Sequence, residues 1–237
     1  MPSLLRLALV FLASLLIFSI YLFPASLVVS RLDGVPIAGA PLQLKAVSGR
    51  LWEGQVQWQW RKLSGSALWQ LDWHGLTPGV NLDVRGGIGL SAWVGGTGSS
   101  LTVEGGELTL SGASMSQVEP RLRLAGEVAA RELAVEFRDK AITDASGQLS
   151  YTGGQASGSS QASVDVPALR GLISRTEQGA SLEVSTLSDQ RLAHGEIKGN
   201  VGEFTVLRAW AAELGLSRGG NLDDAIFQTS LPLWSKD

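Results

Sequence analysis

The stretch that decides the fold of this chain is Ser48–Trp73, SGRLWEGQVQWQWRKLSGSALWQLDW. Polar and apolar residues alternate strictly from Gln55 to Trp60, so Val56, Trp58 and Trp60 share one face. A period of two residues is typical of a β-strand with one buried face. The first half of the stretch is therefore predicted to be such a strand.

A second alternating run follows the turn-forming residues of Arg61–Ser66. Four residues of this run share a face: Ala67, Trp69, Leu71 and Trp73. Two such runs across a short connection predict an antiparallel hairpin with a tryptophan-lined side.

Short alternating runs continue through the rest of the chain. The 237 residues include 29 glycines, which favours many turns and few long helices. The spacing is that of a β sandwich, a barrel or a long curved sheet. Besides the hairpin, strands are predicted at Pro41–Val47, Val80–Val84, Ile88–Val94, Leu101–Val103, Glu107–Leu110, Arg121–Leu124, Glu132–Phe137, Gln148–Tyr151, Ser163–Val166, Ser181–Leu187, Arg191–Lys198 and Ala225–Leu231.

Two segments have helical spacing. Pro167–Arg175 places apolar residues at i, i+3 and i+4 after a proline suited to a first helical position. Glu203–Leu214 has an apolar stripe, with Gly215 at its end as a stop signal. Gly153–Ser163, rich in Gly, Ser and Gln, is predicted to be a flexible loop or a weak edge strand.

The amino-terminal segment Leu4–Phe23 is apolar apart from Arg6, and Pro24 ends it. A helix of this length crosses roughly 30 Å of hydrocarbon. The alternative interpretation is a cleaved signal peptide, whose apolar region is usually shorter, about 7–15 residues. Retained as an anchor, the segment predicts a cytoplasmic amino terminus and a chain lying mostly in the periplasm.

The predicted architecture is mainly β. It has one N-terminal transmembrane helix (residues 1–24), a linker (25–41) and a periplasmic β-rich domain (42–237). The domain is expected to be a long curved antiparallel sheet, forming a β-groove, an open barrel or a sandwich. One or two short helices are expected near the C-terminus.

Composition argues against several kinds of chemistry. The formal net charge of −3, with scattered cations, gives no basic field for nucleic acid. The absence of cysteine excludes disulfides, thiol catalysis and thiolate metal sites. The two histidines, His74 and His194, lie far apart, and no phosphate loop, dinucleotide loop or nucleophile elbow occurs. We therefore expect no metal, no cofactor, no catalytic residue and no enzymatic activity.

The tryptophans Trp58, Trp60, Trp69 and Trp73 allow two interpretations. Large aromatic side chains dominate β cores. Tryptophan also favours membrane interfaces and contact surfaces, and this hairpin follows the apolar segment closely. A possible aromatic contact face therefore stands beside the core interpretation.

Four residues of the stretch, Gly49, Leu51, Trp52 and Gly54, resemble the Gly-x-Leu/Val-Trp-x-Gly signature of the N component of bacterial type II secretion systems. Other features resemble the family more loosely. They are Leu71-Asp72-Trp73 ahead of Pro78, Leu124-Ala125-Gly126-Glu127-Val128, and Leu214-Gly215 followed by Gly219-Gly220 and Ala225–Leu231. The family in turn is similar to larger AsmA-like proteins with groove-forming β sheets.

The resemblance implies an inner-membrane protein with a periplasmic β domain that takes part in the export of folded proteins across the outer membrane. Its implied partners are other secretion-system subunits in the inner membrane and periplasm, and the four signature residues are candidate contact residues. Strand addition to an open sheet edge is one mode of contact. The alternative hypothesis is a lipid-binding or lipid-transport module that holds phospholipid in an apolar β-groove.

Overall fold

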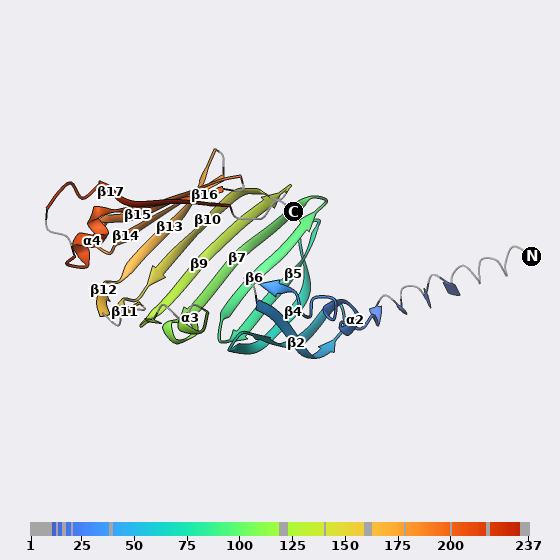
Figure 1. Cartoon of the computed structure of the whole chain (residues 1–237). Coiled ribbons are helices and arrows are strands. Elements are labelled where there is room, and N and C mark those ends of the chain that lie inside the picture. Colours follow the sequence, from blue (N-terminus) through green and yellow to red (C-terminus); the bar gives the residue numbers. More distant parts are fainter. Residues whose placement is uncertain are drawn as a thin grey trace, which may run out of the picture.

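Figure 1 shows a wide sheet that twists and curls along its length, with the amino-terminal segment at one edge. The structure is a computed structural model, and it describes residues 11–12, 14–15, 18–19, 21–37, 40–118, 123–139, 141–158, 163–177, 179–199, 201–216 and 219–232. Within these residues no helix has the length and hydrophobicity needed to cross a membrane. More than half of the predicted span, Leu4–Phe23, falls outside them.

The main element is a 14-stranded sheet in which each strand is antiparallel to its neighbours and the strand order follows the sequence. Among the described residues, β17 and β1 do not pair, so the sheet is open rather than a closed barrel or a sandwich. Its strands are β1 (Pro36–Ile37), β2 (Ala40–Gly49), β3 (Glu53–Trp60), β4 (Leu63–His74), β5 (Thr77–Gly86), β6 (Gly89–Thr97), β7 (Ser100–Ser111), β9 (Glu127–Arg138), β10 (Ala141–Tyr151), β13 (Leu169–Thr176), β14 (Gly179–Thr186), β15 (Arg191–Lys198), β16 (Val201–Leu207) and β17 (Ala225–Pro232).

Smaller elements lie at the ends of these strands (Figure 1). A 3-stranded sheet contains β12 (Ser163–Val166), β11 (Gly154–Ser157) and β8 (Arg123–Leu124). Three short helices are described: α2 (Ser26–Val29), α3 (Gly112–Val118) and α4 (Arg208–Glu213). The first of them lies inside the predicted linker.

The predicted tryptophan-lined hairpin is formed by β3 and β4, which pair without a register shift. Val56 lies opposite Ala67 and Trp58 opposite Gly65, so the apolar residues of both strands share one face. We call this side the apolar face, and the side that carries Gln55, Gln57 and Gln59 the polar face. The alternation of the sequence therefore determines which side of the sheet is apolar.

One buried cluster on the apolar face lies on this hairpin. Trp58, Trp60 and Leu63 are buried together, and Val118 at the end of α3 packs against them. The side chain of Arg61 donates a hydrogen bond to the carbonyl of Val118, which joins the hairpin turn to the helix. A fully buried side chain of this size contributes about 1.5–3 kcal/mol of transfer free energy.

A second buried cluster joins α4 to the sheet. Leu192 of β15 packs with Leu207 and Ala209, and Trp210 of α4 covers them. Among the described residues, one buried cluster therefore lies near each edge of the sheet.

The predicted helix at Pro167–Arg175 is wrong, because this segment is β13, paired with β10 and β14. Leu169 and Ile173 lie on the apolar face, whereas Leu172 lies on the polar face and is exposed. The i, i+3, i+4 spacing arises because apolar residues occupy both faces of one strand.

The predicted helix Glu203–Leu214 is correct only in its second half. Residues 203–207 belong to β16, in which Phe204 pairs with Gly195 and Val206 with Ala193. Only Arg208–Glu213 form α4. A short apolar run fits either period, and here the pairing with β15 decides it.

Two glycine-containing segments predicted to be turns lie within strands. The hairpin connection is Arg61-Lys62, not Arg61–Ser66, since β4 begins at Leu63 and Gly65 pairs with Trp58. Gly105-Gly106 produces a bulge inside one long strand, β7, rather than a turn between two strands. Gly153–Ser163 in turn contains β11 of the small sheet.

Candidate functional site

The loop between β2 and β3 carries the four signature residues and contacts the incoming amino-terminal segment. The Gly49 carbonyl accepts a hydrogen bond from Ala25 N at 3.3 Å. Leu51 N donates to the carbonyl of Phe23 at 3.0 Å. Trp52 Nε1 donates to the carbonyl of Tyr21 at 3.1 Å. We call this contact between residues 21–25 and 49–52 the junction.

Further contacts order the junction. Pro24 forms a β-bridge with Arg50. The Arg50 guanidinium lies 4.8 Å from the centre of the Tyr21 ring, a cation–π contact worth about 0.5–1 kcal/mol at an exposed site. Ala25 is fully buried. The signature loop therefore holds the point at which the amino-terminal segment meets the sheet.

The glycines of the signature are required by close approach. Gly49 has φ +98°, and a Cβ there would lie 2.6 Å from the Gly54 Cα. At Gly54 a Cβ would collide with the ring of Trp69 and lie 2.6 Å from the Ser48 carbonyl oxygen. Trp69 Nε1 donates to the Leu51 carbonyl at 3.2 Å, so the ring over Gly54 also holds the loop.

The four tryptophans of the predicted aromatic face lie on the apolar face, as the register of β3 and β4 requires. Their surroundings differ. Trp58 and Trp60 are buried in the hairpin cluster. Trp69 covers Gly54 at the junction. Trp73, near the end of β4, is 58% exposed. The four residues therefore do not form one uniform contact surface.

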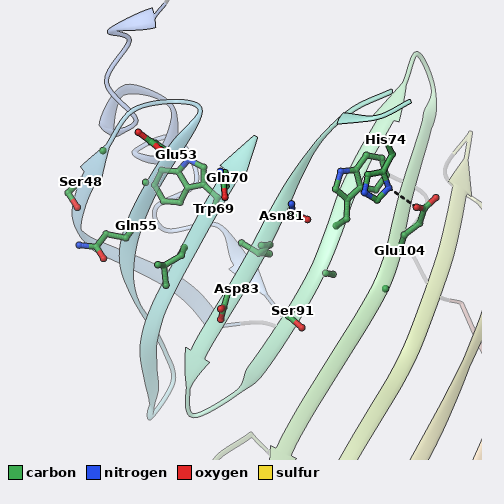
Figure 2. A pocket seen from close by; sticks show the side chains of 17 residues that line it. Ser48, Glu53, Gln55, Trp69, Gln70, His74, Asn81, Asp83, Ser91 and Glu104 are labelled. Atoms are coloured by element: carbon green, nitrogen blue, oxygen red, sulfur yellow. Dashed lines mark hydrogen bonds and ion pairs between the residues drawn. The ribbon is translucent and has the colours of Figure 1, made fainter. Parts of the chain in front are cut away.

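A cleft of about 980 Å³ lies beside the junction, over β3 to β7. One row of residues crosses these five strands in direct register on the polar face: Glu53, Gln70, Asn81, Trp93 and Glu104. All five line the cleft, together with Gly49 and Gly54 of the signature. In Figure 2, Glu53 and Trp69 lie at one end of the cleft, and His74 and Glu104 at the other.

The far end of the cleft is built on a stacked pair of rings. The His74 and Trp93 rings are parallel, with centroids 4.1 Å apart, and His74 Nδ1 donates to Glu104 Oε2 at 2.9 Å. Glycines at 79 and 95 leave space for the Trp93 ring, since a Cβ at either would collide with it. Trp93 is 5% exposed, and its indole N–H is buried without an acceptor among the described residues.

The charges of the cleft are mainly negative. Its lining includes the carboxylates of Glu53, Asp83 and Glu104 and no lysine or arginine among the described residues. A hydrogen bond from Arg85 holds the pKa of Asp83 below its ordinary value. Behind the His74 ring, hydrogen bonds from Trp73 N and the Asn81 amide lower the pKa of Asp72. These two carboxylates are thus held in their charged form.

This arrangement is suited to binding through carboxylates, amides and ring faces. Within the described residues no three potential ligands lie close enough together to hold a metal ion. Sequence reasoning misses the cleft, because its row of residues is assembled only by the register of five strands. The signal that points to it is Trp93 near Gly95, with a second glycine, Gly79, on the preceding strand.

Comparison with known proteins decides the family. The family model of the type II secretion system (T2SS) protein N matches residues 40–216. The chain belongs to this family. The match begins at β2 and ends just after α4, so it includes the signature loop, the cleft and nearly all of the sheet. No curated protein and no solved structure matches the chain.

Membership of the T2SS protein N family identifies the chain as a component of type II secretion and implies other secretion subunits as partners. The four residues that resemble the family signature lie in or next to the loop between β2 and β3, which forms the junction.

Proposed function

We propose that the chain is an inner-membrane-anchored structural subunit of the type II secretion machinery. In this role Leu4–Phe23 spans the inner membrane with the amino terminus in the cytoplasm, and the sheet lies in the periplasm. The subunit binds other secretion subunits and takes part in the export of folded proteins without catalysing a reaction.

The observation that carries this proposal is the junction. A chain that is held against the folded domain where it leaves an anchor fixes the position of the domain relative to that anchor. Three hydrogen bonds join Gly49, Leu51 and Trp52 to residues 21–25: Ala25 N donates to the Gly49 carbonyl, and Leu51 N and Trp52 Nε1 donate to the carbonyls of Phe23 and Tyr21. The segment also stays attached beyond Ala25, because Leu44 N donates to Asp33 Oδ1 at 2.8 Å.

The contacts of His74 are suited to binding. Its ring stacks on Trp93, and its Nδ1 is hydrogen-bonded to the Glu104 carboxylate.

The proposed placement is tested by a periplasm-dependent reporter fused after Asp237 and by purification of the tagged full chain from membranes. We expect an active reporter and copurification of other secretion subunits. A reporter active only in the cytoplasm, or a chain that captures no secretion subunit, would contradict the proposal.

A second candidate function, phospholipid binding, is favoured by the apolar face. No second layer of sheet covers this face among the described residues, and Trp73, Leu101 and Phe227 remain exposed there. The same purified full chain, extracted with organic solvent, separates the candidates. Phospholipid in stoichiometric amount favours the lipid module, whereas lipid-free protein that still binds subunits favours the structural subunit.

The junction itself is tested by Trp52→Phe in the full chain. This change keeps most of the ring and removes the N–H that donates to the Tyr21 carbonyl. A hydrogen bond of this kind contributes about 1 kcal/mol. We expect faster protease cleavage within residues 26–35, less secreted cargo and an unchanged unfolding temperature of the sheet.

Trp73→Phe is the matched control, because Trp73 is exposed and its indole makes no hydrogen bond to any of the described residues. It should leave both cleavage and secretion at the wild-type level. If the two substitutions had equal effects, the hydrogen bond from the Trp52 indole would not be what holds the junction together.

A further inference from the structure

The two edges of the 14-stranded sheet differ in whether their outward backbone groups are covered by other residues. At the first edge, β1 and the residues before it cover the outward backbone groups of β2. Gly34 N donates to the Leu42 carbonyl, Leu42 N donates to the Val35 carbonyl, and Leu44 N donates to Asp33. Farther along, Ala25 N donates to the Gly49 carbonyl. This edge is closed to a further strand.

The described residues place no such cover on the opposite edge, β17. Among the described residues, Ala225–Pro232 pair only with β16, and no other segment makes a backbone hydrogen bond to this strand. Ile226 is 45% exposed and Phe227 is 56% exposed. In natural sheets a charged residue, a proline, a bulge or a covering segment commonly prevents an edge strand from pairing with another chain. β17 has a bulge at Ile226, where its register with β16 shifts, and it ends at Pro232; residues 227–231 between them carry no charge and no proline.

We propose that β17 pairs antiparallel with β17 of a second copy of this chain, so that two sheets become one continuous sheet. The strand is complementary to itself. A two-fold axis that passes between one residue and its own copy pairs even-numbered positions with even and odd with odd. The apolar faces of the two copies then lie on the same side of the joined sheet. The absence of charge means that two copies meet without like-charge repulsion.

β17 lies far along the sheet from the edge that holds the amino-terminal segment. With 14 strands about 4.8 Å apart, β17 lies roughly 60 Å along the sheet from the edge that holds residues 25–35. Figure 1 shows β17 and the amino-terminal segment at opposite ends of the strand order.

The chain contains no cysteine, so single cysteines test the pairing directly. In native membranes, the full chain carrying Gln228→Cys or Thr229→Cys should form a disulfide-linked dimer on mild oxidation. Only residues near the two-fold axis bring their Cα atoms within the ~4.4–6.8 Å that a disulfide spans. The yield should therefore fall at Ile226→Cys. Leu172→Cys, at an exposed site of the inner strand β13, is the matched control and should stay monomeric.

A second substitution separates edge pairing from chance collision. Ile226→Lys added to the cysteine that links best should abolish the dimer, because it places a charge on each strand beside the pairing edge. Leu172→Lys should leave it. Monomers at every β17 cysteine, or a cross-link to a different protein, would overturn the proposal. None of these results depends on whether the chain supports secretion, so failure here is distinct from failure of the proposed function.

Discussion

Replacing Trp58 by alanine is expected to lower the free energy of unfolding of the sheet by about 3–5 kcal/mol, because the change loses transfer free energy and leaves a cavity. Trp58 is 8% exposed and packs with Trp60 and Leu63 under α3. For a domain of this size the loss corresponds to a fall in unfolding temperature of roughly 10 °C. Thermal unfolding followed by circular dichroism measures it.

Trp73→Ala is the matched control for this prediction. Trp73 lies on the same face of the same hairpin but is 58% exposed. Exposed substitutions usually change stability by about 0.5 kcal/mol or less. If the two alanine variants unfold at the same temperature, the hairpin cluster is not the core of this part of the sheet.

Gly54→Val is expected to have the second-largest effect and to act on both the fold and secretion. Any side chain at this position collides with the Trp69 ring and approaches the Ser48 carbonyl oxygen. Overpacking of this kind costs about 1–3 kcal/mol. Displacing the ring also breaks the Trp69 hydrogen bond to the Leu51 carbonyl, which loosens the junction. We expect a lower unfolding temperature and loss of cargo export.

Gly158→Val serves as its control, since no atom lies within 4 Å of a Cβ at Gly158 and its backbone does not require glycine. This variant should fold and secrete normally. A stable Gly54→Val protein that secretes normally would mean that the loop accommodates the added methyl groups without the junction.

The architecture can be predicted from the sequence where a single face is apolar. The Gln–Trp alternation of residues 55–60 identifies the hairpin, and the predicted bounds of Ser163–Val166 and Arg191–Lys198 are those of the structure. The prediction fails where apolar residues occupy both faces. In β13, Leu172 on the exposed face produces a helical spacing that the pairing of the strand overrides.

Glycine is the other source of error. Gly65 and Gly105 are typical turn residues, but one lies within a strand and the other at a bulge. At Gly65 the reason is spatial, because a Cβ would collide with the Arg85 carbonyl oxygen of β5 and would lie 2.9 Å from the Trp58 ring. A sequence displays the glycine but not the backbone and the ring that lie against it. For the same reason the junction is visible in the sequence only as a signature, while its partner, the segment 21–25, becomes apparent in the structure.

Because strand order follows the sequence throughout the main sheet, each hairpin can add to the one already made. A polypeptide whose sheet region crosses a membrane pore beginning with β2 could therefore fold as it emerges, with β2 to β4 serving as the template. Contacts between neighbours in sequence keep loop-closure entropy low and favour rapid folding. A chain interrupted during synthesis would then end in a shorter but ordered sheet, with its last completed strand as the new boundary.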